Sequence, residues 1–280
     1  MTTRFARPSF VQSAVRIFDL SLGQMLWSRR SVFLALVVVG PVALALGIRG
    51  IMAFTPARLP MVNGARMTGS AIFGLMIWLL YLRFIVPVLG VLYGTSLVAD
   101  EVEDKTITYL FTRPIPRGAV LVGKYFAYLV CTTLLVLPSV VVVYFVMTPL
   151  GGGRIGEQFP SLLSDLGMLA VGLAAYGALF SLVGARLKRP LIVGLVFTFG
   201  WEQIALIFPG YLKYGTIAFF LQALVPHAMP AEESVVGGIF HLFNEIPPIE
   251  TSLLSLAGIT VVALWLASRA VQTREFVLEQ

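Results

Sequence analysis

The chain has 280 residues, of which 58% are hydrophobic and only 12% charged, and its mean hydropathy is +0.90. Soluble domains carry about 25% charged residues, so this composition excludes an ordinary soluble protein and indicates an all-α polytopic membrane protein. The net charge of +6 is explained by the Lys and Arg excess of cytoplasmic loops, and we expect no nucleic-acid partner.

Residues 1–30 predict an amphipathic helix that lies on the cytoplasmic surface of the bilayer. The segment carries five arginines and a single acid, Asp19. Its larger apolar residues recur on one helical face, namely Val11, Val15, Phe18, Leu22, Met25 and Leu26. A signal peptide is not expected, because the charged region before the apolar run is too long.

Six apolar stretches within residues 31–269 predict six transmembrane helices. We expect them at 31–48, 71–99, 125–149, 166–185, 191–208 and 251–268, each near the length of about 20 residues that crosses a bilayer. Cys131 lies in the third stretch and is expected to pack in the core.

Residues 209–250 form a long connection that we place outside the cytoplasm, before the last helix and a cytoplasmic tail at 270–280. Residues 214–231 in this connection are also uncharged, but a seventh span there would put the basic tail outside. We therefore expect a re-entrant or interfacial element at 214–231.

The distribution of basic residues predicts the orientation. With both termini in the cytoplasm, 14 Lys and Arg residues lie inside and five outside, while Arg83 stays in the membrane. This bias follows the positive-inside rule, so we expect a multi-pass protein of the inner (plasma) membrane with cytoplasmic termini.

The densest charged segment of the chain falls between the second and third expected spans. Asp100, Glu101, Glu103 and Asp104 lie within five positions, and Pro114 then removes a backbone donor. Acids in a first turn suit the positive end of a helix dipole, so the pattern predicts a short cytoplasmic helix at 100–113. Composition alone also allows an ordinary solvated loop here.

This segment resembles the cytoplasmic coupling segment of ABC-2 type transporter permeases. The matching residues, in order, are Glu101, Glu103, Thr106, Leu110, Pro114, Arg117, Gly123 and Lys124. The sequence departs from the family pattern at Lys105, where glycine is usual, and at Pro116, where serine is frequent.

The resemblance implies the permease subunit of an ABC transporter, an exporter in direction, without enzymatic activity of its own. Its partners would be a separate ABC ATPase subunit, which holds ATP and Mg, and a second permease copy in a homodimer or heterodimer. The residues that would contact or shape the ATPase groove are Glu101, Glu103, Thr106, Leu110, Arg113, Pro114 and Arg117.

A nucleotide-binding loop is nearly matched within this chain. Residues Gly118 to Lys124 have the spacing of a phosphate loop, but Tyr125 stands where Ser or Thr would hold magnesium. The apolar middle of the segment is also the wrong context. We therefore expect no cofactor in this chain.

Two charges inside expected spans need an explanation. Arg83 lies 17 residues before Asp100 and Glu202 lies 13 residues after Arg189, which places them about 25 Å and 20 Å from the cytoplasmic edge along their helices. A charge at the bilayer centre costs about 2.5–3.5 kcal/mol, so such residues usually face a cavity or each other. We expect Arg83 and Glu202 to pair or to line the translocation route, although separate snorkelling to the outer interface stays open.

Two other function classes remain as alternatives. An ion-coupled secondary carrier could use Arg83 and Glu202 without any ATPase. A membrane-embedded metal-dependent enzyme could use the outer cluster of His227, His241, Glu232, Glu233, Glu245 and Glu250, although this spacing matches no metal motif and we predict neither a metal site nor catalytic residues. The sequence does not name the transported substrate.

Overall fold

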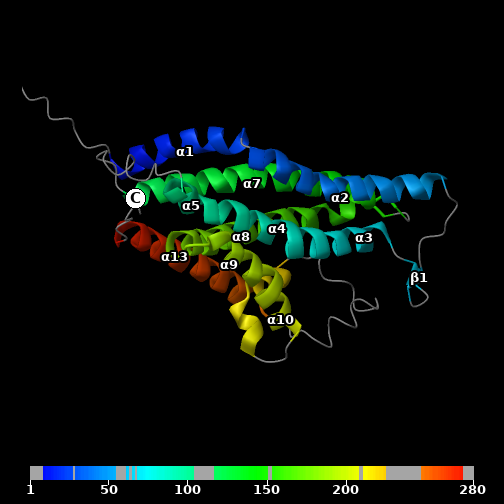
Figure 1. The fold of residues 1–280 in the computed structure, drawn as a ribbon. Coiled ribbons are helices and arrows are strands. Elements are labelled where there is room, and N and C mark those ends of the chain that lie inside the picture. Colours follow the sequence, from blue (N-terminus) through cyan, green and yellow to red (C-terminus); the bar gives the residue numbers. More distant parts are fainter. Residues whose placement is uncertain are drawn as a thin grey trace, which may run out of the picture.

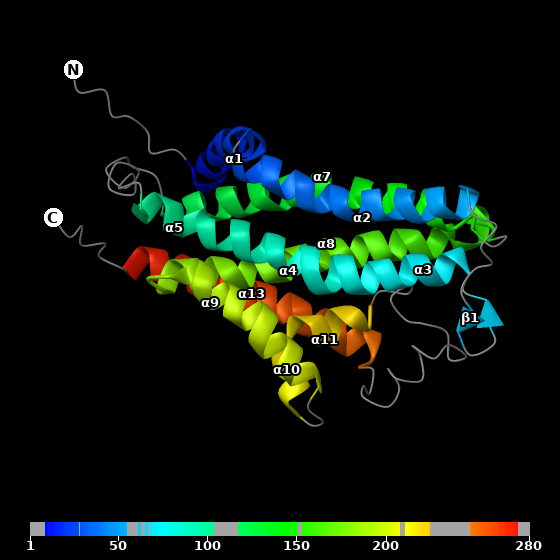
Figure 2. The same ribbon diagram turned by 45° about the vertical axis from the view of Figure 1, so that its right-hand side comes forward.

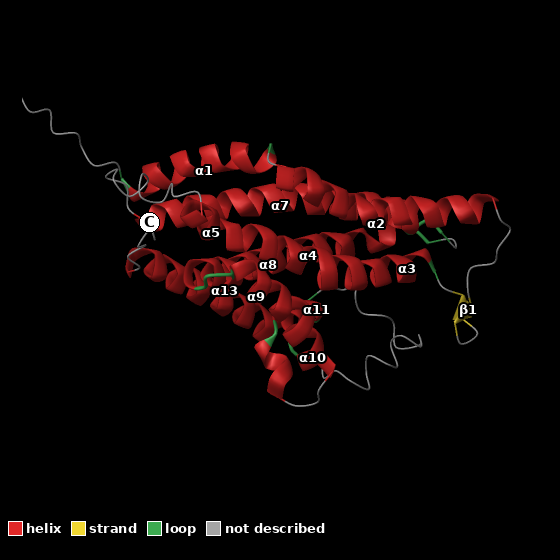
Figure 3. Cartoon of the chain, viewed as in Figure 1, coloured by secondary structure: helices red, strands yellow, loops and turns green. Residues whose placement is uncertain are grey.

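Long helices account for nearly all regular structure in the computed structural model, which describes residues 9–27, 29–54, 61–62, 65–66, 68–103, 117–150, 153–207, 211–224 and 247–273 (Figure 3). The helices are α1 (Phe10–Leu26), α2 (Arg29–Phe54), α3 (Gly69–Met76), η1 (Ile77–Ile85), α4 (Val86–Leu89), η2 (Gly90–Gly94), α5 (Thr95–Glu103), α7 (Arg117–Met147), α8 (Ile155–Arg186), α9 (Pro190–Val196), η3 (Phe197–Trp201), α10 (Glu202–Ile207), η4 (Tyr211–Gly215), α11 (Ile217–Gln222) and α13 (Ile249–Thr273). One hairpin joins β1 (Met61–Val62) to β2 (Ala65–Arg66).

The long helices α2, α7 and α8 and the run from α3 to α5 lie side by side along one direction in an elongated bundle, while α9 and α10 slant away from it (Figure 1). Two of the helices are compound: α3, η1, α4, η2 and α5 form one continuous helix, here called span 2, and α9, η3 and α10 form another, here called span 5. The start of α1, the end of α5, the start of α7 and the end of α13 lie together at what we call the proximal end (Figure 2). The end of α2 and the start of α3 lie at the opposite, distal end.

The helix lengths confirm the expected fold class. Five helices are long and apolar enough to cross a membrane, at Leu34–Phe54, Gly69–Ala99, Gly118–Met147, Ile155–Arg186 and Ile249–Gln272. The sixth expected span corresponds to a shorter apolar helix, Pro190–Ala205 in span 5. The described part of the chain is therefore an all-α polytopic membrane protein.

Most spans are longer than the sequence predicted, and α2 and α8 show the reason. The first expected span stopped before Arg49, but α2 continues past it because the Arg49 Nη1 donates to the Val146 carbonyl at 3.2 Å, near the C-terminal end of α7. The fourth expected span began after Asp165, but α8 starts at Ile155 and carries Asp165 fully buried. A charged residue marks the end of a span only where the bundle offers its side chain no polar partner.

Helix α1 forms as predicted and packs on the proximal half of α7. Ser9 closes a capping box with Gln12 at its start. The buried face is small, with Ser13, Ile17 and Ser21 turned inward. A Cβ at Gly123 of α7 would lie 2.5 Å from the Ala14 carbonyl oxygen, so the two backbones lie in close contact.

The apolar stripe predicted along α1 is divided between two environments. Val11, Val15 and Leu26 are exposed, while Leu22 and Met25 pack against the hydrophobic core. The exposed members leave an apolar surface of α1 uncovered within the described residues.

The uncharged stretch 214–231 does not cross the bundle in its described part. Its helix, α11, has six residues, about 9 Å of helix, which is far too short to span a bilayer. All six are buried, and α11 packs against α8 and α13. Residues 225–246, including the remainder of the expected outer connection, lie outside the described residues.

Span 2 lies against α8 through glycines, which let the two backbones approach. A Cβ at Gly90 would lie 2.6 Å from the Tyr176 Cβ, and one at Gly94 would lie 2.9 Å from the Phe180 Cβ. A Cβ at Gly184 of α8 would overlap the Thr95 carbonyl oxygen. Small residues at a transmembrane interface permit such close packing, so the proximal half of span 2 and α8 form one tightly packed unit.

Candidate functional site

Both charged spans contain a π-helical segment at the level of their charged residue. In η1 the Val86 N–H donates to the Tyr81 carbonyl, five residues earlier, and Pro87 supplies no N–H at all. In η3 the Glu202 N–H donates to the Phe197 carbonyl, again five residues earlier. Short π segments inside α-helices occur frequently at functional sites; η1 contains Arg83, and Glu202 directly follows η3.

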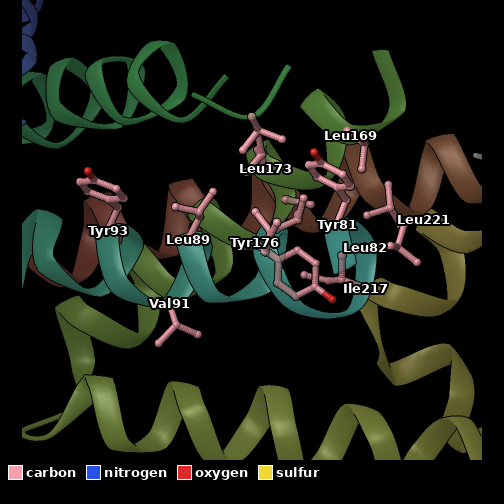
Figure 4. Close-up of a cluster of buried hydrophobic side chains, with 14 of the residues drawn as sticks. Tyr81, Leu82, Leu89, Val91, Tyr93, Leu169, Leu173, Tyr176, Ile217 and Leu221 are labelled. Carbon is pink, nitrogen blue, oxygen red and sulfur yellow. The ribbon is translucent and has the colours of Figure 1, made fainter. Parts of the chain in front are cut away.

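Glu202 is buried in the bundle, with 1% of its surface exposed. Its Oε2 accepts a hydrogen bond from the Tyr176 hydroxyl at 2.6 Å, and its Oε1 accepts one from the Ile217 N–H at 3.1 Å. Figure 4 shows Tyr176 of α8 beside Leu82 of span 2 and Ile217 of α11. The carboxylate thus joins span 5, α8 and the start of α11 in one buried junction.

Arg83 is half-buried and does not bond to Glu202 directly. Its Nη1 donates to Oε1 of Gln203, the residue after Glu202, at 2.8 Å. The guanidinium also lies over the Trp78 ring, 5.0 Å from the ring centroid, and the charges of Glu202 and Arg83 attract each other. Spans 2 and 5 therefore meet at Arg83, but through the Gln203 amide and not through Glu202.

The Arg83–Gln203 pair lies on an exposed side of the bundle among apolar side chains. Phe84 and Phe199 have ring centroids 6.0 Å apart and are 44% and 45% exposed. Side chains one turn apart share a helical face, so Leu79 accompanies Arg83 and Phe199 accompanies Gln203. We call this surface the Arg83 face, made of Leu79, Arg83, Phe84, Val196, Phe199, Gln203 and Ile204.

Sequence reasoning missed the neutral partners of both charges. Gln203 and Tyr176 carry no charge, so the hydropathy pattern did not indicate them as partners. A Gln directly after the intramembrane Glu202 could nevertheless have indicated a polar contact at this position. The spacing of Gly90 and Gly94, a small-xxx-small pattern, could also have identified the contact with α8.

The predicted ATPase-coupling residues are only partly placed. Glu101 and Glu103 belong to the last turn of α5, so the first residues of the expected helix at 100–113 continue span 2 without a break. Arg117 is the first residue of α7. Thr106, Leu110, Arg113 and Pro114 lie outside the described residues. Both ends of the segment lie at the proximal end of the bundle (Figure 1).

The near match to a phosphate loop is helical. Residues Gly118 to Lys124 form the first turns of α7, where Gly123 lies against α1. The following Tyr125 donates its hydroxyl to the Ala174 carbonyl at 2.8 Å. Residues 121–124 lie past the first turn of α7, so their N–H groups bond within the helix and are not available to a phosphate.

The described residues contain no group of three His, Cys, Asp or Glu side chains placed to hold a metal ion. Most of the outer cluster considered from the sequence lies outside that part of the chain, including His227, His241, Glu232, Glu233 and Glu245; Glu250 lies in the first turn of α13.

Comparison with known protein families agrees with this architecture. A family model described as ABC-2 family transporter protein matches residues 13–274, which include all six spans. A comparison with curated proteins found no match. With nearly its whole length matched, the chain belongs to the ABC-2 family of transporter proteins.

Proposed function

We propose that this chain is the permease subunit of an ABC exporter, driven by a separate ATPase that docks on residues 100–117. A second permease subunit, identical or related, completes the route. The proposal rests on the family and on the position of this segment between the end of span 2 and the start of α7. ATP and Mg belong to the partner, in keeping with the helical form of residues 118–124.

The observation that carries the proposal is the tight contact between the proximal half of span 2 and α8. Glu103 lies two turns beyond Thr95, whose carbonyl lies against Gly184 of α8. Gly177 of α8 in turn receives the Tyr128 ring of α7, with no room for a Cβ between them. A displacement at residues 100–103 is therefore passed to α8 and α7 by packed backbone, since cores of this density transmit strain.

The proximal end then faces the cytoplasm of the inner (plasma) membrane. This orientation follows from the basic residues and puts the docking segment where ATP is available. The outward direction of transport follows from the resemblance of the segment to exporter permeases.

The contacts of Glu202 disfavour an ion-coupled carrier. Glu202 is 1% exposed and accepts hydrogen bonds from α8 and α11, so an ion could reach its carboxylate only by disrupting the packing of these helices. We assign Glu202 to holding α11 in place and Arg83, which is half-exposed, to the route.

Charge reversal at the docking segment tests the proposal. The double variant Glu101→Lys/Arg117→Glu should insert and fold normally but separate ATP hydrolysis from transport in the reconstituted complex with its ATPase. The matched control is Arg154→Glu/Glu157→Arg, which exchanges an exposed pair, 2.9 Å apart, near the distal end. Normal transport by the first variant would show that the coupling segment is misassigned.

A further inference from the structure

The depth of Arg83 in its helix raises the question of what its charge faces. Span 2 runs from Gly69 to Glu103, so Val86 is its middle residue and Arg83 lies only three residues away, about 4.5 Å along the axis. Arg83 therefore lies inside the apolar stretch Gly69–Ala99 and not at either of its ends. A half-exposed charge there is costly against lipid, so the Arg83 face must look onto something polar or anionic.

Among the described residues, no carboxylate forms an ion pair with Arg83. Its Nη1 bonds to a neutral amide, and its buried Nε has no hydrogen-bond partner among the described residues. Glu202, the nearest carboxylate, is held by donors on α8 and α11 and is 1% exposed. The guanidinium therefore has N–H donors left over after its bond to Gln203, and the other side chains of the Arg83 face are apolar.

A second copy of the chain does not supply the missing anion from its described spans either. Away from their ends, these spans contain two carboxylates, Asp165 and Glu202, and both are buried. No described residue then supplies the counter-charge, which favours a molecule that visits the face. The aromatic rings of Phe84 and Phe199, exposed beside the guanidinium, fit an apolar body attached to that charge.

We propose that the transported substrate is an amphipathic organic anion, whose carboxylate, sulfonate or phosphate group pairs with Arg83 while its apolar body packs on Leu79, Phe84 and Phe199. This inference rests on the proposed function only in calling the ligand a substrate. Binding itself needs neither ATP nor the ATPase. Gln203 positions the guanidinium by accepting its Nη1 hydrogen bond.

The test compares two probes that share one body. Full-length protein in nanodiscs of zwitterionic phosphatidylcholine is titrated with a pyrene-labelled dodecyl sulfonate and with the uncharged pyrene-labelled dodecanol. Binding is read from energy transfer out of the tryptophans, of which Trp78 lies beside Arg83, after subtraction of the signal from empty nanodiscs. A charge-assisted bond to Arg83 predicts that the sulfonate binds about tenfold to a hundredfold more tightly than the alcohol.

Three variants test whether the preference for the sulfonate over the alcohol depends on Arg83. Arg83→Gln should abolish the preference for the sulfonate, and the nearly isosteric Gln203→Glu should do the same by pairing the guanidinium internally. Arg83→Lys keeps the charge and should keep part of the preference. Arg154→Gln, at an exposed arginine, is the control and should leave it unchanged.

The outcomes separate this inference from the proposed function. An equal affinity of the unaltered protein for both probes would overturn the inference, as would an undiminished preference in Gln203→Glu. Gln203→Glu also tests the inference if Arg83→Gln fails to fold. Failure of an ATPase to associate would overturn the proposed function while leaving these binding results untouched.

Discussion

Replacing Gly184 by alanine tests the contact that we hold responsible for force transmission. A Cβ there would overlap the Thr95 carbonyl oxygen and lie 3.1 Å from the Thr95 Cα, so the backbone of span 2 or of α8 must shift. Overpacking of this kind costs about 1–3 kcal/mol. Alanine favours helix by about 1 kcal/mol over glycine, which offsets part of that cost.

A second glycine on the same helix provides the control. Gly167 of α8 has nothing within 4 Å of the position of a Cβ, so Gly167→Ala gains the same helix preference without the overlap. The difference between the two variants isolates the contact, and we expect Gly184→Ala to be less stable than Gly167→Ala by about 1–3 kcal/mol. This corresponds to about a 5- to 150-fold difference in the unfolding equilibrium constant.

The assay has two parts. Reversible unfolding in mixed micelles measures the free energy of unfolding of each variant, and the reconstituted complex reports substrate moved per ATP hydrolysed. Gly184→Ala should lower both quantities relative to Gly167→Ala. Equal stability and equal coupling ratios in the two variants would refute the claim that span 2 and α8 move as one unit.

The buried junction and the α1 contact give further predictions. Tyr176→Phe removes a hydrogen bond to the Glu202 carboxylate and should lower the free energy of unfolding by about 1.5–3 kcal/mol. Tyr81→Phe, which removes a bond to a neutral hydroxyl, should cost only about 0.5–1.5 kcal/mol, and a larger loss in Tyr81→Phe would contradict a charged Glu202. Gly123→Ala should displace α1 and increase its proteolysis, whereas Gly47→Ala, with open space around it, should not; equal cleavage would refute the close α1–α7 contact.

The spans were predictable because apolar stretches of this length have few alternatives. A run of about 20 uncharged residues must satisfy its backbone internally, and helices do so without a partner strand. The same physics made Arg83 and Glu202 conspicuous, since a charge in an apolar run is expensive. The exact ends of the spans were harder to predict. Arg49 and Asp165 lie within helices, although the charge pattern predicted that a span would end at each of them.

The partners of the site residues could not be predicted from the sequence. Arg83 bonds to Gln203 rather than to Glu202, and the choice depends on the local π-helical turns of η1 and η3. Such a turn shifts the register of every later side chain around the helix axis, and hydropathy does not report it. The bond from Ile217 to Glu202 depends in addition on α11 folding back into the bundle.

Entry of force from a separate ATPase through residues 100–117 is the step on which the proposed function depends. Its most direct test is cross-linking in native membranes from a photoreactive residue placed at Thr106, with a second one placed at Gly156, near the distal end of the bundle, as the control. We predict that an ATP-hydrolysing subunit copurifies with the chain and is captured from position 106 only. Capture from position 156 instead, or transport by the purified chain with no ATPase present, would contradict the account.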